Sequence, residues 1–393
     1  MSEVYARRGR PAARRPSGSR SHPQREPRIH PDEARRTVTI TAMTSLDVRA
    51  GLPAVLVVDP CRPLLERGPG TRVVGLAPGT AVVVDELTPP LAALLDELAR
   101  PAHRDRVLAR AVEAGADPAE AVAMVVDLLA CGAVVDADRA ARTARRRAGA
   151  IVRVQGDGPI AVGVACGLAA AGVGTVEIVA AGVVEREDVG TGYLDEDRGR
   201  SRAAAAADAS RRVAPGVRTR LPTRFAPDLV VLADAAASDP VTVRGLVATG
   251  VAHLQARTRD GHGVVGPLVL PGRSACLECL DRHRADLDPE WGRLAPRLAR
   301  LRAAADAPAV VATIGMATAQ ALTVTDGTVT PPAALGATVE IDVVAAVTAR
   351  RRWSRHPGCP CSGAGARLTP DAGHRARRVV ECTPGPRRGT IEA

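Results

Sequence analysis

Residues 151–184 read IVRVQGDGPIAVGVACGLAAAGVGTVEIVAAGVV, and this stretch decides the fold. Three of the first four residues are apolar and β-branched, as in a buried strand. Gly156 and Gly158 interrupt the run, small helix-forming residues follow, and residues 176–179 begin another strand. This order predicts half of a βαβ unit, in which the N-terminus of the helix can face a phosphate. A single G-x-G is a weak signature, and a simple tight turn fits it equally well.

The composition is that of a large folded chain from a strongly biased genome. Of 393 residues, 46% are hydrophobic, which leaves room for two domains, and every basic residue other than histidine is Arg. The net charge is +10, but residues 1–45 carry +6 and residues 350–393 carry +7, so the remainder is slightly acidic at −3. Because the basic charge lies at the two ends, we expect no specific nucleic-acid partner.

Targeting signals are missing from the expected places. The N-terminus has no apolar segment of the secretory type, and Glu177 interrupts the least charged stretch, residues 161–184. We therefore expect a cytoplasmic protein without a membrane partner. In such a chain, eight cysteines favour a metal site or free thiols over a disulfide framework.

Five segments are expected along the chain. They are a disordered Arg- and Pro-rich tail (1–45, with Met43 as an alternative start), a small domain (46–136), a charged linker helix (137–150), an α/β domain (151–362) and a flexible tail (363–393). Within the α/β domain, further strands are expected at 228–234, 252–255 and 263–270, and a helix of small residues at 309–322.

The small domain is expected to be winged-helix-like. A hairpin (71–76 and 81–84) precedes a helix that begins at Pro89, is capped by Thr88 and buries Leu91, Leu94, Leu95 and Leu98. A second helix (103–114), a third that begins at Pro118 and buries Val122, Val125, Val126 and Leu129, and a strand at 133–135 complete it.

Two phrases in this domain, VVVDELTPPLAALLDELA and DPAEAVAMVVDLLACGAVVD, resemble the PqqD-like peptide-recognition element. The resemblance implies that a leader peptide adds a strand to a sheet edge within residues 71–84. A structural cap or a dimerisation module is the alternative.

Two cysteine pairs predict a metal site. Cys276 and Cys279 form a C-x-x-C pair, and Cys359 and Cys361 form a C-x-C pair some eighty residues later. Two such pairs supply the four thiolates of a tetrahedral Zn²⁺ site, which we expect to be structural because it would staple the C-terminal segment onto the α/β domain. His356 or His283 is the alternative for one ligand.

The α/β domain with these cysteines resembles the ThiF/MoeB (ubiquitin-activating-enzyme-like) superfamily. The matching pieces, in order, are GDGPIAVGVACGLAAAGVGTVEIV, DRGRSRAAAAADASRRVAPGV, PDLVVLAD, VGPLVLPGRSACLECLDRHR and HPGCPCSG. The resemblance implies a Rossmann-like α/β fold with a structural zinc site, homodimers, and adenylation of a carrier protein's C-terminal carboxylate with Mg-ATP.

The nucleotide-binding residues depart from that family's pattern. Pro159 and Ala161 stand where the family has glycines, and proline removes an N–H from the phosphate loop. No acid follows the second strand, and Arg202 stands in place of the catalytic lysine. If a nucleotide is bound at all, the resemblance assigns it to Gly156, Gly158, Arg200, Arg202 and Asp234.

Two functions follow as hypotheses, and the sequence leaves open whether the chain is an enzyme. The first is a pseudoenzyme with an eroded ATP site that binds a leader peptide or small carrier protein for a partner such as a YcaO-type cyclodehydratase. The second is an active, ATP-dependent adenylyltransferase. An oxidoreductase is disfavoured for two reasons. The acid that would bind the ribose of NAD is missing, and an oxidoreductase would not account for the zinc site.

Overall fold

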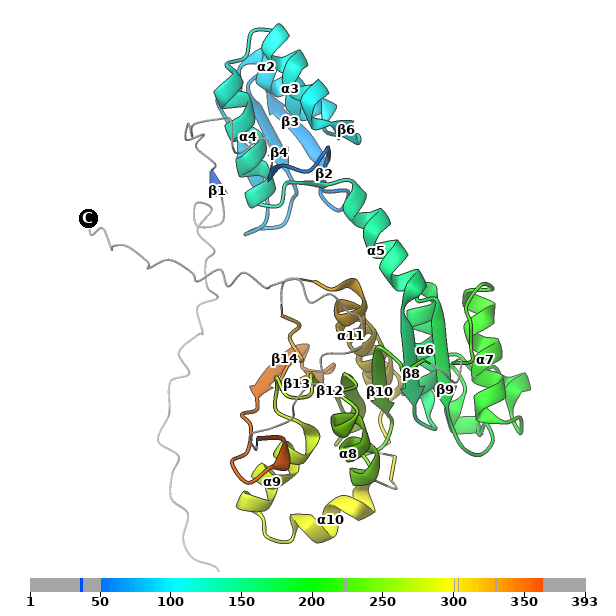
Figure 1. Cartoon of the computed structure of the whole chain (residues 1–393). Helices are drawn as coiled ribbons and strands as arrows, with labels where there is room; N and C mark the ends of the chain where they lie inside the picture. Colours follow the sequence, from blue (N-terminus) through cyan, green and yellow to red (C-terminus); the bar gives the residue numbers. More distant parts are fainter. Residues whose placement is uncertain are drawn as a thin grey trace, which may run out of the picture. The chain divides into compact units, whose positions relative to one another are not determined.

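The computed structural model describes residues 36–37, 51–221, 225–299, 301–302, 304–328 and 331–362. The chain divides into two compact units, residues 1–140 and 141–393, each with its own hydrophobic core (Figure 1). The two predicted tails lie outside the described residues, apart from Arg36–Thr37, which form strand β1. The finer domain boundaries stay predictions.

The described residues of the first unit include two small sheets and helices α2, α3 and α4. The sheet orders are β1-β5-β4-β3 and β6-β2-β7. The strands are β1 (Arg36–Thr37), β2 (Val55–Val58), β3 (Leu64–Gly68), β4 (Thr71–Val74), β5 (Val82–Val84), β6 (Ala102–His103) and β7 (Val134–Asp136). The helices are α2 (Pro89–Glu97), α3 (Arg104–Glu113) and α4 (Pro118–Ala130).

The predicted hairpin and the three helices of this unit are confirmed. Strand β4 pairs with β5 in antiparallel register, and the four leucines predicted for the buried face of α2 are buried. Two details were wrong. Thr88 stands at the N-cap of α2 without a side-chain hydrogen bond, and Val126 and Leu129 are only partly buried, because α4 packs through its other apolar residues.

The hairpin edge predicted to take a leader-peptide strand has a partner strand in the structure, and the pairing with a peptide stays a prediction. Strand β4 lies between β3 and β5, and the outer side of β5 pairs in parallel with β1, Arg36 opposite Val82 and Thr37 opposite Val83. Strand β3 was not predicted, because three of its five residues are exposed and none is buried, so it lacks the apolar alternation of a half-buried strand. Among the described residues, β5 therefore already accepts a further strand on its outer side.

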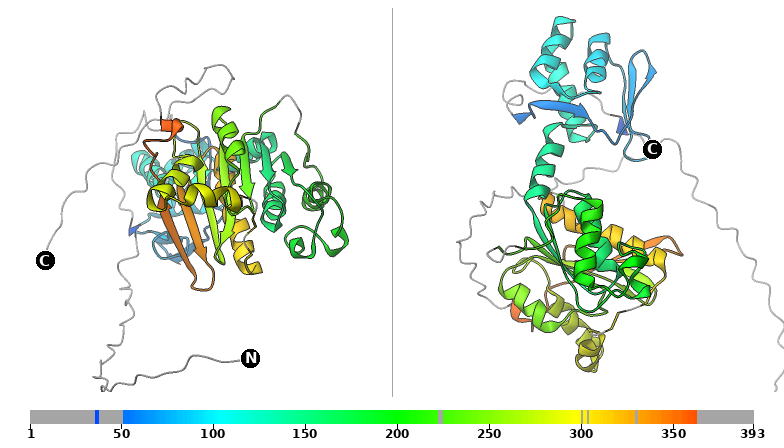
Figure 2. Two further views of the ribbon diagram at one scale, coloured as in Figure 1. Left: turned by 90° about the horizontal axis from the view of Figure 1, so that it is seen from below. Right: turned by 90° about the vertical axis from the view of Figure 1, so that its right-hand side faces the viewer.

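The second unit is a mixed α/β domain around one seven-stranded sheet, with the order β14-β13-β12-β11-β10-β8-β9 (Figures 1 and 2). Strands β9, β8, β10 and β11 are parallel, and β12, β13 and β14 continue the sheet in antiparallel pairs. The strands are β8 (Ile151–Gln155), β9 (Thr175–Val179), β10 (Leu229–Ala233), β11 (His253–Arg259), β12 (His262–Val269), β13 (Ala337–Asp342) and β14 (Val347–Arg352).

Helices complete the unit. They are α5 (Asp138–Gly149), which covers the segment predicted as a linker helix, α6 (Pro159–Ala170), α7 (Arg202–Val213), α8 (Pro240–Ala248), α9 (Leu277–Leu287), α10 (Trp291–Leu298) and α11 (Ala307–Asp326), with short 3₁₀ turns η1 (Arg186–Asp188), η2 (Asp195–Asp197) and η3 (Pro360–Ser362).

The central strand β10 explains the layering, because every one of its residues is buried. Leu229, Val231 and Ala233 belong to the core formed with α6 and α11. The alternate residues Val230 and Leu232 belong to a second core with α8 and α9. Since side chains alternate along a strand, the sheet is covered on both faces, as predicted for a Rossmann-like domain.

Helix α11 has the length and apolar character that could cross a membrane, the one such helix in the described part of the chain. It packs on α6 and on strands β11 and β12, and its buried residues Ala317 and Ala321 belong to the main core. These contacts account for the buried side of α11, whereas its other side, which includes Val311 (58% exposed), stays exposed.

Candidate functional site

The turn between β8 and α6 surrounds a buried carboxylate. Asp234, just after β10, accepts backbone N–H bonds from Gly158 (Oδ2, 2.9 Å), Ile160 (Oδ1, 2.9 Å) and Ala161 (Oδ2, 3.1 Å). Asp234 has a φ of 68°, and this left-handed conformation follows directly on the last residue of β10. The N-terminus of a helix favours an anion, and here the anion belongs to the protein.

The two glycines of the turn are required by this carboxylate. A Cβ at Gly158 would lie 2.6 Å from Asp234 Oδ1, and a Cβ at Gly156 would lie 2.8 Å from both Asp234 Oδ2 and Ala233 O. Side chains at either position would push Asp234 out of its place. The G-x-G pattern is therefore explained by close approach of Asp234.

Burial raises the pKa of Asp234 from its ordinary 3.8 to about 6, against the opposing effect of the three N–H donors and of Arg302. The residue is 5% exposed. At neutral pH it is mostly ionised, so an incoming phosphate would meet a negative charge at the end of α6.

Arg202 lies near this turn but is fully engaged by other groups. Its Nε donates to Asp188 (2.9 Å), Nη2 donates to Glu185 (3.1 Å), and Nη1 donates to the carbonyl of Ala181 (3.1 Å). Asp188 is completely buried, and Arg202 is 7% exposed. A buried ion pair with these extra hydrogen bonds holds the guanidinium in one place.

Arg302 links the two parts of this cluster, and sequence reasoning missed it. It donates to Asp188 (2.6 Å), to Glu185 (3.3 Å) and to the carbonyl of Asp157 in the glycine turn (3.1 Å). It reaches this position because the backbone at 301–302 pairs with the segment at 235–236, next to Asp234. No local motif marks Arg302, since it lies 114 residues from Asp188.

Of the five predicted nucleotide residues, four lie at this cluster and one does not. Gly156, Gly158 and Asp234 form the turn, and Arg202 shares its two carboxylates with Arg302. Arg200 points elsewhere, to Asp197 and Asp208, each at 2.5 Å. These positions describe where the residues lie, and their part in nucleotide binding stays a prediction.

The loops after β8 and β9 are joined at this edge of the sheet. After β9 the chain places Ala180, Ala181 and Gly182 where the family pattern implies an acid for the ribose. The N–H of Ala181 donates to Asp157 Oδ1 (2.6 Å), which ties the loops after β8 and β9 together. Asp234 accepts hydrogen bonds from the N–H groups of α6. The groups at the position of a nucleotide in this fold are therefore already hydrogen-bonded to one another.

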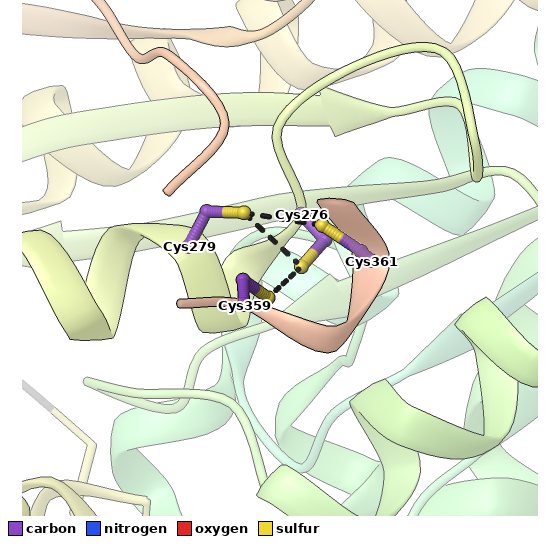
Figure 3. Close-up of side chains that lie close together, drawn as sticks. All are labelled: Cys276, Cys279, Cys359 and Cys361. Atoms are coloured by element: carbon purple, nitrogen blue, oxygen red, sulfur yellow. Dashed lines mark hydrogen bonds between the residues drawn. The ribbon is translucent and has the colours of Figure 1, made fainter. Parts of the chain in front are cut away.

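The four predicted cysteines gather into one cluster (Figure 3). The sulfur atoms of Cys276 and Cys279 are 3.7 Å apart, those of Cys276 and Cys359 are 3.6 Å apart, and those of Cys279 and Cys361 are 3.2 Å apart. Zn–S bonds of about 2.3 Å in a tetrahedron place the sulfurs about 3.8 Å from one another. The donor set and spacing fit Zn²⁺.

The local fold supplies these ligands. Cys276 is the N-cap of α9 and Cys279 lies in its first turn, while Cys359 and Cys361 flank the start of the short turn η3. Burial raises the pKa of the Cys276 thiol, and it raises the pKa of Cys359 to about 12, so both hold their protons until a cation takes their place. All four ligands are thiols, so neither predicted histidine alternative is needed.

A model of the ThiF family matches residues 150–361, more than half of the chain, and the chain therefore belongs to the ThiF family. Its fold is similar to that of MccB from E. coli: the structure solved with ATP has a TM-score of 0.61 at 15% identity and covers 79% of this chain and 100% of that chain.

Two further structures have a similar fold. A further structure of E. coli MccB has a TM-score of 0.60 at 16% identity, covering 82% of this chain and 99% of that chain. PaaA has a TM-score of 0.53 at 14% identity, covering 75% and 100%. Curated proteins contain no match to this chain. At these identities the likeness shows the fold alone.

Proposed function

We propose that this protein is a ThiF-family pseudoenzyme with a degenerate ATP site. In this proposal it binds a leader peptide or a small carrier protein and presents it to a partner enzyme, such as a YcaO-type cyclodehydratase that forms thiazoles or oxazoles. It does so as a cytoplasmic homodimer whose zinc ion is structural.

One observation carries the proposal: the Asp234 carboxylate is bound by three N–H groups at the N-terminus of α6. A phosphate that took those donors would have to displace a buried acid from them. The nearest predicted cation, Arg202, is held by Asp188 and Glu185, and moving it towards a phosphate would break its ion pair with the buried Asp188, which would then keep only Arg302. Both features oppose nucleotide binding.

The peptide part of the proposal is supported by the outer edge of β5. That edge pairs with β1 through Val82 and Val83, so its backbone groups are directed towards an added strand. A leader peptide would replace β1 there. The fold of E. coli MccB, which was solved with N-formylated MccA, is similar.

The homodimer is supported by the exposed side of α11. Val311 is 58% exposed, and Gly315 and Ala319 lie at four-residue spacing behind it, both exposed. Small residues in such a row let two helices approach closely. A second copy of the chain is the proposed occupant.

The test is isothermal titration of Mg-ATP into protein whose zinc content is measured on the same sample. We expect no measurable heat of binding from a sample whose zinc content is sufficient to fill the four-cysteine site. Micromolar binding would contradict the degenerate site. An Asp234→Ser variant sharpens the test, because it removes the acid and frees the three N–H groups. If Asp234→Ser binds Mg-ATP weakly and the wild type does not bind it, the result supports the role given to Asp234.

The second candidate is an active adenylyltransferase of a carrier protein's C-terminus, favoured by the similarity in fold to a protein solved with ATP. Pyrophosphate exchange in the presence of a carrier that ends in Gly-Gly distinguishes the two functions. In this second case exchange occurs and is lost in Arg202→Ala. It persists in Arg200→Ala, whose side chain lies among other carboxylates. Absence of exchange with every carrier tested removes this candidate.

A further inference from the structure

A second group of metal-ligand side chains lies beside the four cysteines. His283 and Asp286 stand three residues apart on α9, and His356 comes from the loop that leads to Cys359. One ligand atom from each of the three side chains lies within 4.8 Å of the other two. The histidines are half-buried and Asp286 is exposed, so the group can be reached from solvent.

The hydrogen bonds of His283 orient it as a metal ligand. Its Nε2 lies 3.1 Å from the carbonyl oxygen of Ser354, an acceptor, so Nε2 carries the proton. The lone pair is then on Nδ1. Histidines that bind metals commonly donate their other N–H to a backbone carbonyl in this way, which fixes the ring.

His356 and Asp286 are already in hydrogen-bond contact. His356 Nε2 lies 3.0 Å from Asp286 Oδ2, and the N–H of Gly358 donates to Nδ1 of the same ring (3.0 Å). A cation between the imidazole and the carboxylate would replace that hydrogen bond. Binding of the cation would also break the hydrogen bond from Gly358. The affinity of this group for a metal ion is therefore lower than that of the four thiolates.

A simple ion pair does not account for the whole group. The His356–Asp286 contact would need only one histidine, yet the ring of His283 lies edge-on to that of His356, with centroids 5.0 Å apart at 70°. Nearby cations do not oppose a metal, because Arg282 is paired with Glu278 and Arg284 with Asp281.

The cysteine cluster holds this group together. Cys276 and Cys279 open the helix that carries His283, and Cys359 follows His356 by three residues. The zinc ion therefore fixes α9 against the loop that brings in His356. We therefore expect a metal ion to fill the four thiolates before it fills the second group.

We propose that His283, Asp286 and His356 form a second site for a divalent metal such as Zn²⁺. Two imidazoles and a carboxylate are borderline donors that suit Zn²⁺ and Co²⁺, and three protein ligands leave the fourth position open to water or an acidic group of a bound partner. Tetrahedral bonds of about 2.0–2.1 Å place the ligand atoms about 3.3 Å apart, so small side-chain rotations complete the site.

The test is Co²⁺ titration of the metal-free full-length protein, followed by optical spectroscopy. The first equivalent gives strong bands of tetrahedral cobalt with sulfur-to-metal charge transfer. The second adds weaker bands with no further charge transfer. Metal analysis of the zinc-loaded protein gives two ions per chain, of which a mild chelator removes one.

Variants decide the assignment. His356→Ala and Asp286→Asn lose the second equivalent and keep the first, and the intact thiolate bands show that the domain is folded. His262→Ala is the control, since it removes another exposed histidine beside a single carboxylate, Asp342 at 3.7 Å, and keeps both ions. One ion per wild-type chain, or two in His356→Ala, overturns the proposal.

Discussion

Replacing Asp234 by Asn tests the buried carboxylate at the end of α6. Asn keeps the size of the side chain and tolerates the left-handed backbone at this position, but it cannot ionise. Its single carbonyl oxygen can replace Oδ2, which accepts from Gly158 and Ala161, and its NH₂ group then faces the N–H of Ile160. The variant loses one hydrogen bond and a buried charge together, so a single stability value cannot separate them.

The pH dependence does separate them. Below about pH 4, Asp234 is protonated in both the folded and unfolded states. Between about 4 and 6 the folded protein keeps a proton that the unfolded chain has released, so raising the pH favours unfolding. Above about 6 both states are ionised and the effect is complete. A rise from 3.8 to about 6 corresponds to about 3 kcal/mol.

We therefore expect the free energy of unfolding of the wild type, minus that of Asp234→Asn, to fall by about 3 kcal/mol between pH 4 and pH 7.5. Urea unfolding at several pH values measures it. Asp260→Asn is the control, because Asp260 also has a positive φ, at 51°, but is 90% exposed. A flat difference refutes the reasoning, and a rising difference means that the three N–H donors outweigh burial.

Three other changes test the fold and its metal. Cys276→Ser is expected to lose the structural zinc and to lower the melting temperature by several degrees, read by metal analysis and calorimetry; full zinc content would contradict it. Gly174→Ala places a Cβ 1.8 Å from the carbonyl of Ala148 and is expected to cost more than about 3 kcal/mol in urea unfolding, whereas Gly216→Ala, with no atom within 4 Å, changes little. Arg257 is 2% exposed, its Nε has no hydrogen-bond partner among the described residues, and burial lowers its pKa to about 9. Arg257→Met is thus expected to raise stability by about 1–3 kcal/mol, and a lower melting temperature would refute this.

The sequence predicted the elements whose signal is local. The turn at Gly156 and Gly158, strand β10 and helix α11 were all found, because apolar runs, glycines and small residues mark them directly. Strand β14 was not found. Each of its residues is exposed and three are Arg, since it closes the sheet as an edge strand and has no face to bury.

The metal site was predictable over a long distance because its chemistry is specific. Cys276 and Cys359 are 83 residues apart, yet two thiol pairs in one chain have few other uses, and their sulfurs meet. The polar cluster near the β8–α6 turn has no comparable sequence signature. Asp188 and Arg302 look like ordinary charged residues of loops, and only the fold brings them together.

Asp234 shows why the site was harder to predict than the fold. Its position after β10 was foreseen, and the family pattern suggested a side chain open to a nucleotide. The direction of that side chain depends on the backbone angle at Asp234, which turns the carboxylate back onto the N–H groups of α6. The glycines at 156 and 158 permit this contact as readily as they would permit a phosphate. The G-x-G motif is thus compatible with two opposite arrangements. The site is open to a nucleotide if the anion at the N-terminus of α6 is a phosphate, and it is closed if the anion is the carboxylate of Asp234.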